Sequence, residues 1–423
     1  MGKGIEYITG KVDITRDLVF LLVIGGLYSL GIFLSNTFVN IYLWKQSGDY
    51  ITIAMYNLGI FLFQPITFIL AGKIAKRIDR VIVLRLGVIF LSLFFLSVLI
   101  IADKASTYNF VLGSLLGVGY GFYWLAFNVL TFEITEPETR DFFNGFLGIL
   151  QSFGGMVGPL LAGIIIANMS ENFGYKTIFT VSFILFIGAV ACSFLLKRRQ
   201  AEGGFHFKRI LIERHHNKNW RKILHAHIFQ GLREGIFGFI IAIWVFLVTK
   251  SEFALGMFNL FLSGLSFVFY FAVTKFIKPY RRKKAILAGA LILYFSIYII
   301  LFHISYANLI FYAILIGIAY PIINVPYASL TYDVIGKGWK AKELRVEYIV
   351  VRELFVNIGR VSSILIFLIT VSLFQAEKVI PILLVTLGTG HLFIYFFIRN
   401  IYLGSSPKKE VMIKEQMTDE KNR

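Results

Sequence analysis

Charged residues are scarce in this chain, and cysteine is nearly absent. Asp, Glu, Lys and Arg make up only 16% of the 423 residues, which is too few to cover the surface of a soluble domain of this length. The single cysteine, Cys192, excludes an intrachain disulfide and a cysteine-based metal site. It lies in an apolar run, where we expect it to serve in packing.

Motifs of the common catalytic sites are also absent. No phosphate-binding loop, Ser-His-Asp order, HExxH pair or dinucleotide fingerprint occurs in the structural context that it requires. We therefore expect neither an enzyme nor a cofactor or metal. Histidines concentrate in one stretch, interleaved with Lys and Arg: His206, His215, His216, His225 and His227. Because a metal site needs a defined geometry and further ligands, we interpret this stretch as a solvated basic linker near anionic headgroups.

Long apolar runs are what the sequence has instead. Hydrophobic residues make up 57% of the chain, and 44 residues are Phe. Runs of about twenty residues, the length that spans a bilayer, recur throughout. The sequence therefore predicts an all-α polytopic membrane protein. The predicted spans are approximately 18–44, 51–72, 81–102, 108–131, 142–168, 174–196, 225–249, 253–274, 285–303, 306–331, 347–374 and 379–402.

Basic residues give the predicted orientation. A formal net charge of +18 suggests a nucleic-acid binder, but the charges are spread over short loops, so no nucleic-acid partner is expected. The loops and adjoining span ends on one side hold only five basic residues, Lys45, Lys104, Lys176, Lys250 and Lys378. The positive-inside rule then places both termini in the cytoplasm. We expect a multi-pass protein of a bacterial plasma membrane, whose first apolar run is too long for a cleavable signal.

The two halves of the sequence repeat in the same order. Tyr56-Asn57-Leu58 in the second span matches Phe258-Asn259-Leu260 in the eighth, and the fourth span matches the tenth at an offset of 200 residues. We predict a six-helix bundle in 1–196, a cytoplasmic basic linker in 197–224, a second six-helix bundle in 225–403 and a cytoplasmic tail in 404–423. Two parallel-repeat bundles of this kind enclose a central cavity near the bilayer midplane.

The loop after the second span carries a signature motif. It reads Gly72-Lys73-Ile74-Ala75-Lys76-Arg77-Ile78-Asp79-Arg80 and, with the topology, resembles the major facilitator superfamily over essentially all twelve spans. The family pattern G-x-L-A-D-R-x-G-R is matched at Gly72, Ala75, Arg77 and Arg80. Lys76 replaces the Asp that helps to latch the inner gate, and Asp79 replaces the second Gly. The resemblance implies a gate at this loop, with Asp79 as a substitute for the missing latch.

A second motif lies in the fifth span. Residues 154–163 read Gly-Gly-Met-Val-Gly-Pro-Leu-Leu-Ala-Gly and resemble the G-x-x-x-G-P-x-x-G-G motif of antiporters in the same family, which implies antiport. The small Gly158 and the kink-permitting Pro159 also suit close helix packing, which has no bearing on direction. The fourth span lacks the arginine of many drug–proton antiporters of the family. Both interpretations of the motif stay open.

Polar side chains inside the spans are the candidates for the transport pathway, because each needs a partner or water in hydrocarbon. The first half offers only neutral candidates, Asn36, Asn40, Gln64, Asn128 and Gln151. The second half holds Arg233 and Glu234 on the seventh span, Asn324 on the tenth, and Arg352, Glu353, Asn357 and Arg360 on the eleventh. The last three of these follow one helical stripe that we expect to reach the central site.

Two interpretations of the intramembrane charges are open. In one, they form closed salt bridges that orient helices. In the other, Glu234 or Glu353 exchanges a proton while Arg360 or Arg233 competes for it or binds an anionic group. Three arginines against two glutamates leave the cavity mildly positive, which favours an anionic or zwitterionic substrate.

Two further carboxylates are candidates for gating. Glu133 and Asp333 occupy equivalent ends of the fourth and tenth spans, where they can pair with the basic loops as the halves rock. Plain solvated helix ends are the alternative.

The function predicted from the sequence is secondary active transport of a small solute by alternating access. We expect a monomer that is coupled to protons and favours efflux. Uptake of a small anionic or sugar-like solute and lipid export are alternatives within transport. An alternative from a different class is a membrane sensor or scaffold that does not transport.

Overall fold

The computed structural model describes residues 15–134, 137–198 and 203–401, and all regular structure in these ranges is helical. The first half contains α2 (Arg16–Ser47), α3 (Tyr50–Arg77), α4 (Arg80–Ile101), α5 (Asn109–Ile134), α6 (Pro137–Asn168) and α7 (Glu171–Ser193), with a 3₁₀ turn, η1 (Ala102–Lys104). The second half contains α9 (Lys218–Thr249), α10 (Glu252–Phe276), α11 (Arg282–Phe302), α12 (Tyr306–Gly336), α13 (Arg345–Leu373), α14 (Ala376–Gly388) and α15 (Gly390–Ile398), with η2 (Pro279–Arg281). Between the halves lies α8 (Phe207–His216).

Twelve of the described helical segments are long and apolar enough to cross a membrane, with α14 and α15 together forming the last. This confirms the all-α polytopic prediction. The bounds differ most at the seventh span, which was expected to begin at 225. It begins instead at Lys218, because the side chain of Asn217 accepts hydrogen bonds from the backbone N–H groups of Asn219 and Trp220, both at 3.0 Å, and so caps the helix.

The stretch interpreted as a solvated linker is partly folded. Ile210 of α8 is fully buried, and its carbonyl accepts a 3.4 Å hydrogen bond from the indole of Trp220, which is also fully buried. The guanidinium of Arg214 lies 5.6 Å from the ring centroid of Phe355 in α13. His227 is buried inside α9. The solvated interpretation is therefore wrong for Ile210, Trp220 and His227, because apolar side chains of α8 pack on α9 and α13. His206, His215 and His216 are exposed, as that interpretation expects.

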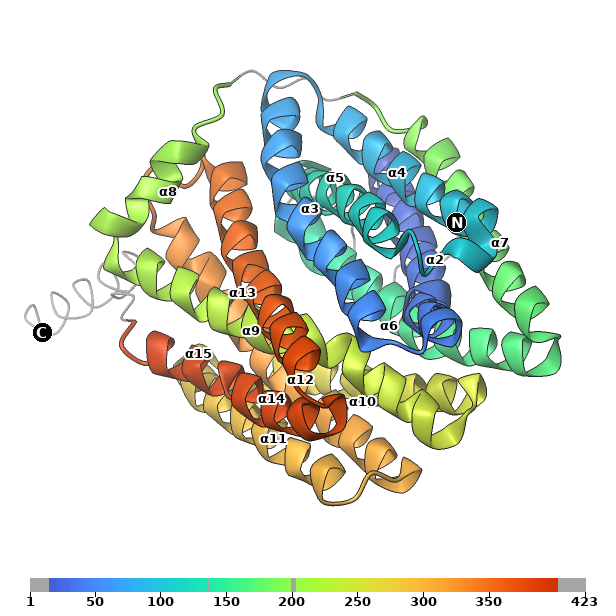
Figure 1. Ribbon diagram of the computed structural model, residues 1–423. Coiled ribbons are helices and arrows are strands. Elements are labelled where there is room, and N and C mark those ends of the chain that lie inside the picture. Colours follow the sequence, from blue (N-terminus) through green and yellow to red (C-terminus); the bar gives the residue numbers. More distant parts are fainter. Residues whose placement is uncertain (1–14, 135–136, 199–202, 402–423) are drawn as a thin grey trace, which may run out of the picture.

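The two halves pack on each other through reciprocal helix pairs. The second helix of the first half, α3, contacts the fifth helix of the second half, α13, and α6 contacts α10 in the same way. Figure 1 shows the blue-to-green half beside the yellow-to-red half, with α3 and α13 next to each other at the junction. Such an exchange of equivalent contacts is what a pseudo-two-fold axis along the bundle produces, and it confirms two six-helix bundles.

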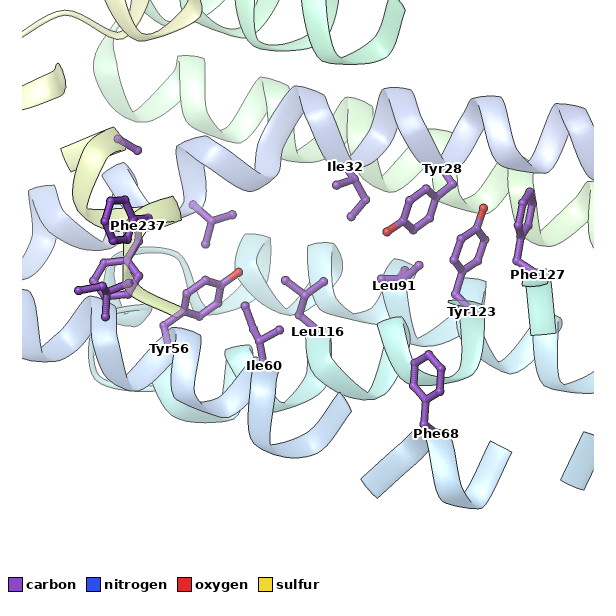
Figure 2. Packing of buried hydrophobic residues seen from close by; sticks show 14 of the residues in the cluster. Tyr28, Ile32, Tyr56, Ile60, Phe68, Leu91, Leu116, Tyr123, Phe127 and Phe237 are labelled. Atoms are coloured by element: carbon purple, nitrogen blue, oxygen red, sulfur yellow. The ribbon is translucent and has the colours of Figure 1, made fainter. Parts of the chain in front are cut away.

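Aromatic side chains fill the interior of the first half. Tyr28 of α2 stacks on Tyr123 of α5, with ring centroids 4.0 Å apart and an interplanar angle of 5°, and Figure 2 shows the two rings facing each other. The indole of Trp124 donates a 2.9 Å hydrogen bond to the hydroxyl of Tyr28. These contacts join α2 to α5 and hold α5 in a fixed position beside the central cavity.

Candidate functional site

Two glycines bring α9 and α13 into backbone contact at the centre of the molecule. A Cβ atom on Gly231 would lie 2.0 Å from the carbonyl oxygen of Val356, and one on Gly359 would lie 2.0 Å from that of Ile228. Only glycine permits so close an approach. Glu234 lies three residues after Gly231 and Arg360 directly follows Gly359, so the contact sets these two side chains against each other.

A charged network follows from this contact. Arg360 donates to Glu234 Oε2 from Nη2 at 2.7 Å and from Nε at 3.1 Å. Its Nη1 lies 3.4 Å from Asn357 Oδ1 and 3.8 Å from Glu353 Oε1. Asn357 in turn donates to Glu353 Oε1 at 3.1 Å. One arginine thus lies between two carboxylates, and the side chains of Arg360 and Glu234 each keep 20% of their surface exposed, so the pair faces a cavity.

Side chains of both halves extend this network. From α3, Gln64 donates to Glu353 Oε1 at 3.1 Å, and the ring centroid of Phe61 lies 5.0 Å from the Arg360 guanidinium. Along α9, Gln230 donates to Glu234 Oε1 at 2.8 Å, and its own Oε1 lies 2.9 Å from His227 Nδ1. The hydrogen bond from Gln64 to Glu353 therefore connects the charged network of the second half directly to the first half.

The network borders a central cavity of about 620 Å³ between the halves. Its lining includes Tyr120, Trp124 and Asn128 from α5 and Glu234, Glu353 and Arg360 from the second half. Two smaller cavities of about 270 and 250 Å³ lie beside it, and Gly238 lines all three. A Cβ on Gly238 would meet nothing within 4 Å. The central site is thus a polar, aromatic-walled space with two side chambers.

Some of the predicted neutral residues line a cavity and others do not. Asn36 and Asn40 line the 270 Å³ cavity, where Asn57 donates to Asn40 Oδ1 at 2.9 Å. Asn128 lines the central cavity, as noted above. Gln151 and Asn324 line none of these three cavities. Sequence alone could not make this distinction, because it depends on helix rotation.

Arg233 and Glu234 are neighbours in sequence but face different surroundings. The Arg233 side chain, only 1% exposed, donates from Nη1 to the hydroxyl of Tyr320 at 2.7 Å. Its guanidinium lies 4.4 Å from the ring centroid of Phe237. Arg233 therefore does not join the Glu234 network, whereas Arg352 reaches that network through a 3.7 Å contact with Glu353 Oε2.

The signature loop forms a contact between the halves at the end of the bundle where α3 ends and α13 begins, here called the linker end. Lys76 donates to the carbonyl of Glu343 at 2.6 Å, and its Nζ lies 3.5 Å from Glu347 Oε1. The Glu347 side chain is fully buried. A Cβ on Gly72 would lie 3.2 Å from Val350 Cγ2. Lys76, the residue that replaces the Asp of the family pattern, therefore forms the contact between the halves with a positive instead of a negative charge.

The other charged gating candidates act within one half. Asp79 accepts hydrogen bonds from the backbone N–H groups of Val81 and Ile82, which caps α4, and its Oδ2 lies 3.4 Å from Arg198 Nε. Asp79 thus stays within the first half and its linker in this conformation, and does not replace the missing latch. Arg282 donates to Asp333 at 2.7 Å within the second half.

Three further predicted positions remain. Arg77 is exposed at the end of α3, and Arg80 begins α4 half-buried. The side chain of Glu133 lies outside the described residues.

A second contact between the halves closes the opposite end. Lys45 of α2 pairs with Glu252, the first residue of α10, which also accepts a 3.1 Å hydrogen bond from the hydroxyl of Tyr175. The motif of the fifth span lies in the same interface: a Cβ on Gly158 would lie 2.9 Å from the backbone N of Leu34. Tight packing of α6 on α2 and α10 thus accounts physically for the small residues of this motif.

The α6–α10 contact includes the backbone of Pro159. Its carbonyl oxygen would lie 2.7 Å from a Cβ on Gly256 of α10. The equivalent approach at Gly163 brings the Glu252 carbonyl within 2.7 Å of a Cβ. The α6–α10 backbones therefore meet along this motif.

Several contacts were missed by reasoning from the sequence. The spans carried no signal that Gln230 and His227 would continue the network, or that Tyr320 would accept a hydrogen bond from Arg233. Lys45 and Glu252 were visible as charges at span ends on opposite halves. Pairing them requires the helix arrangement, which no short motif encodes.

A two-half bundle of twelve membrane-spanning helices around a polar central cavity defines a membrane transporter fold. Residues 21–362 match the model of the Major Facilitator Superfamily. The chain belongs to the Major Facilitator Superfamily.

The chain is also similar to two proteins of related bacteria. The chain is 56% identical over 397 residues, 94% of its length and 92% of the relative's, to "Uncharacterized protein YqgE" of Bacillus subtilis (strain 168). It is 61% identical over 174 residues, 41% of its length and 81% of the relative's, to "Uncharacterized protein in sodM 3'region" of Geobacillus stearothermophilus.

Among solved structures, an auto-inhibited POT family peptide transporter shares the fold, with a TM-score of 0.73 at 10% identity, 93% of this chain and 98% of that chain being covered. The human organic anion transporter MFSD10 (TETRAN) has a TM-score of 0.66 at 14% identity, with 90% of this chain and 99% of that chain covered.

Proposed function

We propose that this protein is a proton-coupled secondary transporter that moves a small solute by alternating access. It works as a monomer in a bacterial plasma membrane, with both termini and the linker end in the cytoplasm. The observation that carries the proposal is the cavity-facing pair of Glu234 and Arg360. A pair that served only to orient helices would be expected to be closed off from the substrate space, whereas this one borders it.

Glu234 is the proposed proton carrier. A buried carboxylate that loses its arginine must gain another partner or a proton, because an unpaired charge in a low-dielectric interior costs several kcal/mol. Arg360 has a second carboxylate within reach, Glu353, at 3.8 Å. Movement of Arg360 from Glu234 toward Glu353 or toward a substrate therefore leaves Glu234 to take up a proton, and the return movement releases it.

The proposed coupling to conformation runs through α3. Gln64 of the first half donates to Glu353 of the second, so rocking of the halves breaks this bond and changes the surroundings of Glu353. The same α3–α13 interface holds the contact of Lys76 with Glu347 at the linker end. The same movement of α3 relative to α13 would therefore open the linker end and rearrange the charged network. Efflux is the proposed direction, because the motif in α6 resembles that of antiporters.

The test begins by identifying a solute. We would compare the metabolites of cells that produce the wild-type protein with those of cells that produce Glu234→Gln or Glu343→Gln. The second variant is a matched control, because the Glu343 side chain is 69% exposed at the linker end. A solute whose cellular level falls with the wild type and the control, but not with Glu234→Gln, is then tested in proteoliposomes.

Coupling is decided by two flux measurements on that solute. We expect an imposed pH gradient to drive its accumulation by the wild type, and we expect Glu234→Gln to lose this accumulation. Exchange of labelled for unlabelled solute, which needs no net proton movement, should persist in the variant. Accumulation that is indifferent to the pH gradient, or unchanged in Glu234→Gln, would refute the proposal.

A further inference from the structure

Arg233 is buried in an unusual state for an arginine. Its Nη1 is occupied by the hydroxyl of Tyr320, but Nε and Nη2 have no hydrogen-bond partner among the described residues. The rings of Phe237 and Tyr320 lie 4.4 and 5.4 Å from the guanidinium carbon. Such contacts orient the group without neutralising it. Two of the three guanidinium nitrogens are therefore buried with hydrogen-bonding capacity that no described residue satisfies.

No carboxylate of the described chain neutralises this charge. Within those residues, no ion pair of Arg233 occurs at 4.0 Å or less, and the adjacent Glu234 is engaged by Arg360 and Gln230. His391 of α15 lies on the Tyr320 side, with ring centroids 6.2 Å apart, and brings no negative charge. An arginine kept only to join helices would be closed by a carboxylate, because an uncompensated buried charge is strongly destabilising.

Arg233 lines a cavity. The chamber of about 250 Å³ is lined by Arg233, by the hydroxyl-bearing Thr37, Tyr312 and Tyr320, and by Asn259. Phe237, Gly238 and Tyr320 line both this chamber and the 620 Å³ central cavity. The chamber is below the usual size of a complete ligand pocket, about 300–1,000 Å³. It suits one end of a ligand, and the central cavity has room for the rest.

We propose that Arg233 binds the carboxylate of an organic anion whose body occupies the aromatic-walled central cavity. This inference deepens the proposed transport function and rests on it, since it names the substrate class for the same cavity. The guanidinium offers parallel N–H donors that match a carboxylate. Tyr320 accepts from Arg233, so its own O–H proton is left to donate to the second ligand oxygen.

In this proposal, two adjacent residues of α9 have different functions. Arg233 recognises the negative end of the solute, and Glu234, on the other side of the helix, exchanges the proton. Gly238, one turn further on, lines both spaces, and a Cβ there would meet nothing within 4 Å. Substrate and proton thus occupy separate sites that share one helix.

The test measures binding without any gradient. The purified full-length protein would be heated in detergent with benzoate or with its neutral isostere benzamide, each at up to about 50 mM, a concentration at which mass action reveals even a millimolar Kd. We expect benzoate to raise the Tm by a few degrees and benzamide to leave it nearly unchanged. Arg233→Gln should lower benzoate affinity at least 10-fold, the loss expected for a charge-assisted hydrogen bond.

Matched variants keep the result interpretable. Arg221→Gln changes an exposed arginine on the same helix and should retain the benzoate response. Tyr320→Phe keeps the ring beside Arg233 and removes only the hydroxyl, so a few-fold loss of affinity is expected even if Arg233→Gln does not fold. Equal shifts with benzoate and benzamide in the wild type would overturn the inference, as would an undiminished benzoate response in Arg233→Gln or, should that variant not fold, in Tyr320→Phe.

Failure of this inference is distinguishable from failure of the proposed function. Glu234→Gln should still be stabilised by benzoate, because Arg233 is intact, while it loses accumulation driven by the pH gradient. Loss of benzoate discrimination with intact proton coupling would refute the anion site alone. Benzoate binding without any coupling would refute the proton mechanism alone.

Discussion

Removing the positive charge of Lys76 should open the contact between α3 and α13 at the linker end. Breaking a buried ion pair costs about 3–5 kcal/mol, and an exposed pair is worth about 0–1 kcal/mol. Glu347 is fully buried, whereas Lys76 keeps 13% of its side chain exposed and also holds the carbonyl of Glu343. We therefore expect Lys76→Met to cost the closed state about 2–3 kcal/mol, a shift of roughly 30–150-fold toward the open state.

Thiol accessibility measures this shift directly. The chain has one native cysteine, so a Cys192→Ser background carrying Asn128→Cys places a single reporter in the lining of the central cavity. A membrane-impermeant thiol reagent applied from the linker end should modify it faster in Lys76→Met than in the parent. Lys73→Met, an exposed lysine one turn earlier on α3, is the matched control and should leave the rate unchanged.

A charge exchange separates electrostatics from general damage. Lys76→Glu alone places like charges together and should accelerate labelling further, whereas the double variant with Glu347→Lys should restore most of the protection. If Lys76→Met labels at the rate of the parent, Lys76 is not a gate contact. If the double variant is no slower than Lys76→Glu, the contact is not electrostatic.

Two further predictions concern the packing around the site and the opposite gate. Gly359→Ala should lower stability by about 3 kcal/mol, read as a fall in Tm, because its Cβ would lie 2.0 Å from the carbonyl of Ile228. Gly238→Ala meets nothing within 4 Å and should be neutral or slightly stabilising, so equal losses in both variants would refute the packing argument. Glu252→Gln removes the partner of Lys45 and should increase labelling of the cavity reporter from the side opposite the linker end. Unchanged labelling from that side would show that the pair does not close the bundle there.

The charge reversal at Lys76 lets the chain depart from its family pattern and still form a polar contact between the halves at this loop. A lysine in place of the usual aspartate would be repelled by a basic partner, but here it meets the buried Glu347 and a backbone carbonyl. Asp79 is used instead as the N-cap of α4. Position 76 therefore contacts the other half through a positive side chain, where the family pattern has a negative one.

The central network could be predicted in part. Spacing on one helix showed that Glu353, Asn357 and Arg360 share a stripe, because helical periodicity is a local property. That Glu234 meets Arg360 depends on the reciprocal glycine contact of α9 and α13. Nothing local distinguishes such glycines from those that only permit packing. The different surroundings of Arg233 and Glu234 depend likewise on the rotation of α9.

The sequence by itself determined the class of protein, the number of spans, the repeat of the halves and the list of polar candidates, because the energetic cost of polar groups in hydrocarbon leaves a direct record in composition and run length. The tertiary structure alone decided which candidates share a cavity and that Lys76 rather than Asp79 links the halves. It also decided that Arg233 lines a chamber and has no carboxylate partner in the part of the chain that the structure describes. These outcomes depend on the relative rotation and approach of helices far apart in the chain. Close backbone contacts at a few glycines fix that geometry, and hydrophobic periodicity does not encode it.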